Sequence, residues 1–185
     1  YILSYNGGEI TNWQTGELMY ENVLDADVLP YLYQCAKDNQ FAIVTYKDKY
    51  VLTEHPDDEY VLKEAILNVM ETKKVDNFLD AIDFPVAKCL IVGEATRLAE
   101  LEKVMYEALK ERMGVYRSEP YFLELVPKGI DKAQSLAVLL EKIGATKEEM
   151  IAVGDGFNDL SMIKFAGLGV AMANAQEVVR QSADY

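Results

Sequence analysis

Two carboxylates and an amide share one short turn of the chain. Asp155, Asn158 and Asp159 belong to the stretch Gly-Asp-Gly-Phe-Asn-Asp at 154–159, directly after the apolar run 150–153. A brief apolar run that ends at glycine is typical of a buried parallel strand. Ligands of open parallel sheets bind at the carboxyl ends of the strands. Hard oxygen ligands beside the start of a helix suit a magnesium ion that holds phosphate.

The same turn has an ordinary structural interpretation. Gly-Asp-Gly is a common turn sequence, and Asp and Asn are frequent helix caps. The downstream residues favour a functional site, because a helical stretch to residue 166 leads to an apolar strand at 167–172 and a helical stretch over 174–184. This order predicts a compact α/β unit with its polar residues at one edge.

A lysine opens the helix expected over 131–144. Asp131 is placed to cap this helix, so Lys132 falls in its first turn, where the helix dipole disfavours a positive charge. An ammonium group there can hold a phosphate and reduce the repulsion between anions. Lys128 is the competing candidate, but its position after Pro127 is typical of a charge in a loop.

The remaining patterns predict an inserted domain within an α/β fold. A strand is expected at 1–5 and a hairpin at 9–13 and 17–21. Further helices are expected over 25–39, 59–71 and 96–113, and further strands over 41–46, 50–53, 89–92, 115–118 and 121–125. Lys73 and Lys74 are expected in a charged loop. We therefore expect the start of a core and a linker at 1–19, an α+β domain at 20–118 and the C-terminal part of the core at 119–185.

Composition limits the class of protein. The chain is 50% apolar and 26% charged, which is normal for a globular protein, and its net charge of −13 argues against a nucleic-acid partner. No apolar run reaches the roughly 18 residues that a membrane span requires, and no leader pattern is present. Cys35 and Cys89 are isolated, and we expect buried free thiols. A cytoplasmic location with no membrane partner is expected; the oligomeric state has no signal in the sequence.

Several of these segments carry a family resemblance. The stretch 154–159 with the following segment 169–175 resembles haloacid dehalogenase-type phosphatases of the Cof-like branch. Residues 123–132 resemble the segment that carries the active-site lysine of this branch, and Asn6-Gly7 resembles its strand end before the cap. The resemblance implies a partial Rossmann-like core with a parallel sheet and an inserted α+β cap of the C2 type.

The resemblance also implies a reaction and roles for residues. The family hydrolyses phosphate esters through an aspartyl-phosphate with Mg²⁺ bound nearby, here on small phosphorylated metabolites, with sugar phosphates foremost. By matching position, Asp155 would bind the metal and Asn158 the phosphate of the substrate. Lys132 would bind phosphate and nucleophile together, and Asp159 would support the metal site as a catalytic residue. Phosphoryl transfer depends mostly on positioning and charge stabilisation, which a metal and a lysine supply.

The nucleophile of the family has no match among these residues. Its Asp-x-Asp motif follows the first strand of the core, upstream of the segment that Asn6-Gly7 resembles. Asp25-Ala-Asp27 has the spacing but introduces a helix and follows no buried strand. We therefore expect the nucleophile to lie outside this chain and the 185 residues alone to have no phosphatase activity.

Two other functions remain open on the sequence alone. The phosphorylation domain of a cation-pumping ATPase also resembles the 154–159 stretch, although no membrane segment flanks it here. A non-catalytic fragment that binds only metal or phosphate would also fit the missing nucleophile. In the cap, Tyr46, Tyr50 and His55 are candidates for substrate contact, but each is also typical of packing or of a loop.

Overall fold

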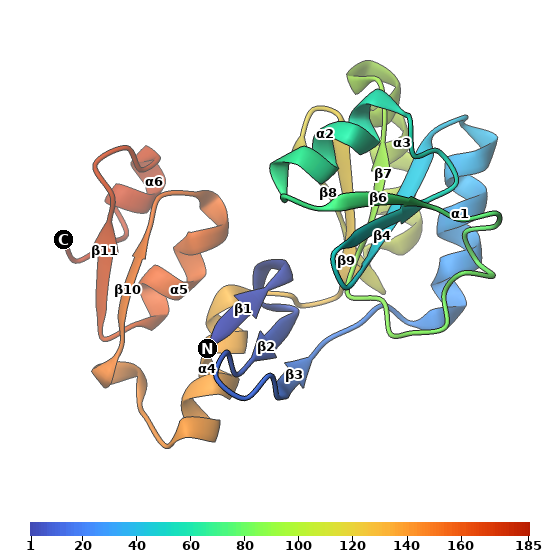
Figure 1. Ribbon diagram of the computed structural model, residues 1–185. Helices are drawn as coiled ribbons and strands as arrows, with labels where there is room; N and C mark the ends of the chain where they lie inside the picture. The colour runs from blue at the N-terminus through green and yellow to red at the C-terminus, as the bar shows by residue number, and fades with distance from the viewer. The chain divides into compact units, whose positions relative to one another are not determined.

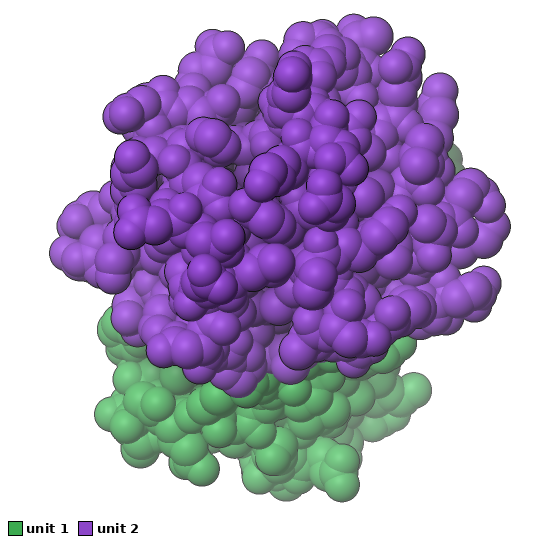
Figure 2. Space-filling model, turned by 90° about the vertical axis from the view of Figure 1, so that its right-hand side faces the viewer, with its two compact units in different colours: residues 1–22, 130–185 green, residues 23–129 purple.

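The chain folds into two compact units that differ in connectivity. The structure is a computed structural model that describes residues 1–185. Unit 1 contains Tyr1–Asn22 and Ile130–Tyr185, and unit 2 is the continuous segment Val23–Gly129 (Figure 2). Unit 2 is therefore an insertion into the sequence of unit 1. None of the helices combines the length and the hydropathy that crossing a lipid bilayer requires.

Unit 2 is built on a six-stranded sheet in the order β6-β5-β4-β7-β9-β8 (Figure 1). The strands are β4 (Ala42–Lys47), β5 (Tyr50–Thr53), β6 (Glu71–Lys74), β7 (Cys89–Val92), β8 (Met113–Glu119) and β9 (Phe122–Pro127). β5 and β6 run parallel, and every other neighbouring pair is antiparallel. A helix connects β5 to β6, because parallel neighbours cannot be joined by a tight turn.

The helices of unit 2 pack on both faces of this sheet. They are α1 (Leu29–Asp38), α2 (Glu59–Leu67) and α3 (Ala95–Leu109), and a 3₁₀ turn, η2 (Ala26–Val28), precedes α1. α1 and α3 bury their apolar stripes in one cluster with Ile43 and Ile91. Side chains alternate between the faces of a strand, so Tyr46 lies on the face opposite Ile43. Its hydroxyl donates to Glu64 of α2 (2.5 Å), which places α2 on that second face.

Unit 1 contains two small sheets and three helices. Its elements are the antiparallel β1 (Ile2–Ser4), β2 (Glu9–Thr11) and β3 (Leu18–Glu21), the parallel β10 (Ile151–Gly154) and β11 (Leu168–Ala171), α4 (Lys132–Ile143), α5 (Leu160–Phe165), α6 (Glu177–Arg180), and the 3₁₀ turns η1 (Tyr5–Gly7), η3 (Lys147–Glu149) and η4 (Phe157–Asp159). Asp131 caps α4 by accepting from two backbone N–H groups, and Gly144 ends it with a φ of 70°. Ser135 of α4 donates to the Gly7 carbonyl (2.5 Å), which fixes α4 against η1.

The expected mixed α/β fold is confirmed, with one restriction on the parallel sheet. β10 and β11 are parallel as expected, but β1, β2 and β3 pair antiparallel, and so do most strands of unit 2. The hairpins expected from the turn residues are present as β2–β3 and β4–β5. Cys35 and Cys89 are free thiols; Cys89 is buried as expected, whereas Cys35 is half-buried.

Three expectations about the inserted segment need correction. Unit 2 extends to Gly129 instead of ending at residue 118, because β9 pairs with β7 and with β8. Its start lies after Asn22, close to the expected residue 20. The helix expected to reach residue 71 ends at Leu67, and Lys73 and Lys74 belong to β6 instead of a loop, because they pair with β5.

β10 is covered on one face only, contrary to the expectation of a fully buried strand. Ala152 packs against Ile163 of α5 and Val179 of α6. The alternating residues Ile151 and Val153 are 64% and 55% exposed. The apolar run predicted burial on both faces, but α5 and α6 cover only the face that carries Ala152.

Candidate active site

The turn after β10 is held together by one side chain. Asp159 is only 7% exposed, and its Oδ2 accepts hydrogen bonds from the backbone N–H groups of Asp155 (3.0 Å) and Gly156 (3.2 Å). Gly154 leaves the space for this arrangement, because a Cβ atom at residue 154 would lie 2.5 Å from the Cβ of Asp159. Asp159 therefore determines the shape of the turn that carries Asp155.

Lys132 reaches the same turn from the first residue of α4. Its Nζ lies 2.5 Å from Asp159 Oδ1, and the two side chains are 24% and 10% exposed. An ammonium group has three N–H donors, so this contact leaves two for a phosphate or another anion. The structure thus brings together the two residues that the sequence predicts as catalytic.

Opposing effects act on the pKa of Asp159. Burial raises this pKa, because the charged carboxylate loses hydration. The hydrogen bond from Lys132 and those from the two backbone N–H groups act in the other direction, and the resulting pKa lies below the ordinary value of an aspartate. Asp159 is therefore ionised at neutral pH and holds the ammonium group of Lys132 in place.

Asp155 and Asn158 each contact an asparagine from a distant part of unit 1. Asp155 Oδ2 accepts a hydrogen bond from Asn174 Nδ2 (2.8 Å), and Asn158 Nδ2 donates to Asn6 Oδ1 (3.3 Å). The sequence patterns assign no role to Asn6 or Asn174. A signal was nevertheless present, because both asparagines follow closely behind a strand of the segments that carry the family resemblance. The site therefore draws on four segments of unit 1.

Few oxygen atoms in this site are available to a metal ion. Both carboxylate oxygens of Asp159 already accept N–H donors, which leaves Asp155 as the available carboxylate. No three carboxylate, imidazole or thiol side chains lie close enough together to hold a metal on their own. This donor set fits Mg²⁺, which is commonly held by one or two carboxylates together with water and substrate phosphate.

The competing candidates from the sequence lie in unit 2 and have structural partners. Lys128 Nζ contacts the backbone oxygen of Glu111 at 2.7 Å. Asp25 and Asp27 both accept hydrogen bonds from Arg112, at 3.3 and 2.7 Å. Surface ion pairs account for these residues, and Lys132 is the lysine that contacts the acidic turn.

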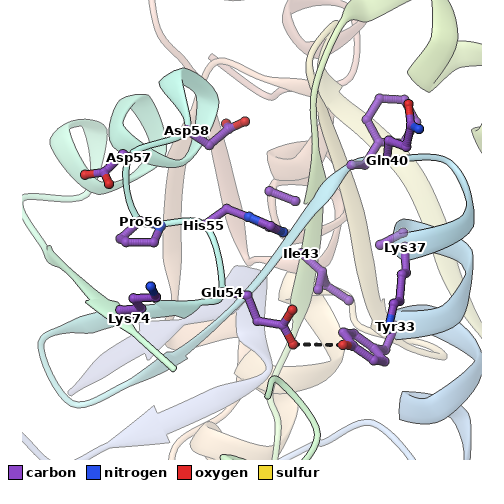
Figure 3. A pocket seen from close by; sticks show the side chains of 13 residues that line it. Tyr33, Lys37, Gln40, Ile43, Glu54, His55, Pro56, Asp57, Asp58 and Lys74 are labelled. Atoms are coloured by element: carbon purple, nitrogen blue, oxygen red, sulfur yellow. Dashed lines mark hydrogen bonds between the residues drawn. The ribbon is translucent and has the colours of Figure 1, made fainter. Parts of the chain in front are cut away.

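The three cap candidates are also in unit 2, but they do not form one cluster of contacts. Tyr46 is buried and bonded to Glu64, and Tyr50 lies beneath the ammonium groups of Lys49 and Lys73 at 5.2 and 5.3 Å from its ring centroid. His55 lines a cavity in unit 2 (Figure 3). Their contact with a substrate stays a prediction.

Comparison with known proteins identifies the family. Residues 1–185 match the haloacid dehalogenase-like hydrolases. The chain belongs to this family. The resemblance drawn from the acidic turn, the lysine segment and the Asn-Gly strand end is therefore confirmed.

Three similar proteins show how far the likeness extends. The crystal structure of a haloacid dehalogenase-like hydrolase from Bacteroides thetaiotaomicron has 60% sequence identity and a TM-score of 0.97, covering 100% of this chain and 69% of that one. The HMP-PP phosphatase of Escherichia coli is 28% identical over 97% of this chain and 65% of its own length. The 5-amino-6-(5-phospho-D-ribitylamino)uracil phosphatase of Bacillus subtilis is 46% identical over 84 residues, which are 45% of this chain and 34% of that protein. The chain thus spans about two thirds of the relatives that it matches from end to end.

Proposed function

We propose that this chain contributes part of the active site of a magnesium-dependent phosphohydrolase that acts on small phosphorylated metabolites. The observation that supports the proposal most directly is the contact between Lys132 and Asp159 at 2.5 Å, within the turn that also presents Asp155. The phosphatase names of the two curated relatives agree with this reaction class. Sugar phosphates are the first substrates to test.

The proposed roles follow from the atoms that each side chain leaves free. The two remaining N–H donors of Lys132 bind the oxygens of the transferring phosphoryl group and stabilise the negative charge that they carry. Asp159 is a positioning residue in this scheme, because its carboxylate fixes Lys132 and shapes the turn. Asn158 binds the substrate phosphate at the edge of the same turn.

Asp155 would hold the metal ion through its carboxylate. Mg²⁺ bound there supplies positive charge to the phosphoryl oxygens and helps to orient them. The hydrogen bond from Asn174 to Asp155 Oδ2 orients the carboxylate, and Asp155 Oδ1 would be the oxygen left to hold the ion.

The nucleophilic aspartate is proposed to lie outside the 185 residues, so that the aspartyl-phosphate forms on a residue that this chain does not contain. The chain alone would then bind Mg²⁺ and phosphate but turn over no substrate. A cytoplasmic location and the absence of a nucleic-acid partner are also proposed, the latter because a net charge of −13 repels polyphosphate backbones.

Binding and turnover test the proposal separately. The 185-residue chain is titrated with MgCl₂ and inorganic phosphate, and amide shifts in its NMR spectrum are followed; we expect saturable shifts at residues 154–159 and 132. Asp155→Asn should abolish the magnesium response, whereas Asp76→Asn, an exposed carboxylate of unit 2, should not change it. No magnesium response at the turn would contradict the assignment of Asp155.

Turnover is measured with Mg²⁺ and an aryl phosphate on the 185-residue chain, and with a panel of sugar phosphates on the intact protein. We expect no turnover by the 185-residue chain and measurable turnover by the intact protein. The Lys132→Ala variant of the intact protein should be slower by about 100-fold or more. Turnover by the chain alone would contradict the external nucleophile. Binding without turnover by the intact protein would favour a non-catalytic metal or phosphate site.

A further inference from the structure

The parallel strands β5 and β6 form a strand–helix–strand unit within unit 2. β5 ends at Thr53, the chain passes through the loop 54–58 into α2, and it returns as β6, which ends at Lys74. Ligands of α/β units bind beside the carboxyl ends of such parallel strands, where the connecting loops leave a crevice. Unit 2 therefore has a preferred position for a ligand that is independent of the turn in unit 1.

A cavity of about 620 Å³ lies at this position (Figure 3). Its volume falls in the range of small-molecule sites. Ala36, Phe41 and Ile43 contribute buried apolar surface to its wall. The loop 54–58 and Lys74 line the side formed by β5 and β6, and the C-terminal end of α1 lines the other.

Two of the three acidic side chains in the cavity wall already accept hydrogen bonds, and the third points away from the cavity. Glu54 Oε1 accepts hydrogen bonds from the Tyr33 hydroxyl and from the backbone N–H of Phe78, both at 2.8 Å. Asp58 is the cap of α2 and accepts from two backbone N–H groups. Asp57 is exposed, and Figure 3 shows its carboxylate pointing away from Tyr33 and from the α1 side of the cavity.

The lysine ammonium groups of the wall have no carboxylate partner, by contrast. Lys37 and Lys74 are exposed lysines that form no ion pair, and the only partner of the Lys37 ammonium is the Tyr33 ring at 5.6 Å. Figure 3 shows the His55 ring pointing toward the middle of the lining side chains. Two ammonium groups without a carboxylate partner favour a ligand that brings negative charge.

We propose that this cavity binds a small organic anion. Its apolar body would lie against Ala36, Phe41 and Ile43, and its phosphate or carboxylate group would contact Lys37 and Lys74 across the mouth. The site lies wholly within unit 2, and it requires neither the metal nor the phosphate proposed for unit 1.

Three probes that share a phenyl ring and differ in the charged group test this site. The ¹⁵N-labelled 185-residue chain is titrated with phenyl phosphate, phenylacetate and phenethylamine, and amide shifts are followed. We expect at least one of the two anions to shift the amides of 37–43 and 54–58 with a dissociation constant below about 1 mM. Which anion binds more tightly tells whether the site prefers phosphate or carboxylate. The amine should bind at least about tenfold more weakly than the better anion.

A pair of double variants separates a local site from the effect of overall charge. Lys37→Gln/Lys74→Gln should raise the dissociation constant of the more tightly bound anion by about tenfold or more. Lys103→Gln/Lys142→Gln removes the same charge from two exposed helix positions elsewhere and should leave the affinity unchanged. The proposal is overturned if no probe saturates, if the amine binds as well as the anions, if the two double variants behave alike, or if the shifts are confined to 154–159.

Discussion

The carboxylate of Asp159 combines a structural and a chemical task. One oxygen holds two backbone N–H groups of the turn, and the other holds Lys132. Because the side chain is 10% exposed, its loss would leave three donors without their partner in a poorly hydrated place. Unit 1 therefore depends on this residue for its stability as well as for the proposed site.

Replacement of Asp159 should destabilise the chain more than replacement of its neighbour. We expect Asp159→Ala to lower the free energy of unfolding by about 2–4 kcal/mol, since it removes the partner of a largely buried ammonium and of two amides. Asp155→Ala, which removes one side-chain hydrogen bond, should lower it by less than about 1 kcal/mol. Urea denaturation of the 185-residue variants measures both values, and equal losses would contradict this role of Asp159.

The lowered pKa of Asp159 predicts a loss of stability in acid. The unfolded chain has an ordinary aspartate pKa of about 3.9, so the unfolded state takes up a proton first as the pH falls. The stabilising contribution is complete above about pH 5 and decreases as the pH falls through the lower pKa of the folded state. The difference in unfolding free energy between the chain and Asp159→Asn should therefore shrink between about pH 6 and pH 3. A difference that does not vary with pH would contradict this coupling.

At this scale the sequence identifies the residue types of the site but not their pairing. Lys132 could be singled out because a lysine at the first residue of a capped helix opposes the helix dipole. The choice of Asp159 over Asp155 as its partner depends on Gly154, which leaves room for the folded-back carboxylate. Asn6 could not be placed against Asn158 before the fold was known, because 152 residues separate them.

At the scale of elements, the C-terminal end of α2 contains an unfavourable residue. Val69 lies beyond the last turn with a φ of 54°, a conformation that is strained for a β-branched side chain. Its side chain is 93% exposed, so packing does not compensate for the strain. Glycine is the usual residue at this place after a helix.

Val69→Gly should therefore stabilise the chain. We expect the free energy of unfolding to rise by about 0.5–1 kcal/mol. The relief of strain at the left-handed backbone conformation exceeds the cost of the added conformational entropy of glycine in the unfolded state. Val104→Gly is the matched control, because this valine is 64% exposed within α3. This substitution should lower the free energy of unfolding by about 0.5 kcal/mol. The two midpoints in urea should move in opposite directions, and destabilisation by both would contradict the prediction.

Patterning predicted the elements whose signals are local. The turn residues between β2 and β3 and between β4 and β5 indicated both hairpins, and Asp131 and Gly144 marked the ends of α4. β6 was missed because Glu71–Lys74 is polar and becomes a strand only by pairing with β5. The exposed face of β10 was not predicted, because the composition of a strand does not show which of its faces packs against other elements.

At the scale of the molecule, the two units differ in their independence. Unit 2 is one continuous segment with its own sheet and a core shared by α1, α3 and the sheet. Unit 1 needs both ends of the chain, because α4 is fixed to η1 by the bond from Ser135 to Gly7.

The segment Val23–Gly129 should fold when it is produced alone. We expect a cooperative thermal transition and amide chemical shifts that overlay those of unit 2 in the full chain, except near the two new termini. Circular dichroism and ¹⁵N-correlated NMR spectra check this expectation. A segment without dispersed amide signals would show that unit 2 depends on unit 1.

The placement of unit 2 inside the sequence of unit 1 has a consequence for synthesis on the ribosome. The segment with β1, β2 and β3 emerges before unit 2, yet its partners in unit 1 begin only at Ile130, and β11 ends at Ala171. At roughly 5–20 residues per second, the early strands wait for roughly 7–30 s before unit 1 can be completed. Unit 2 can fold during that interval. The two parts of unit 1 are then joined by a compact folded unit instead of a long disordered loop when they come together.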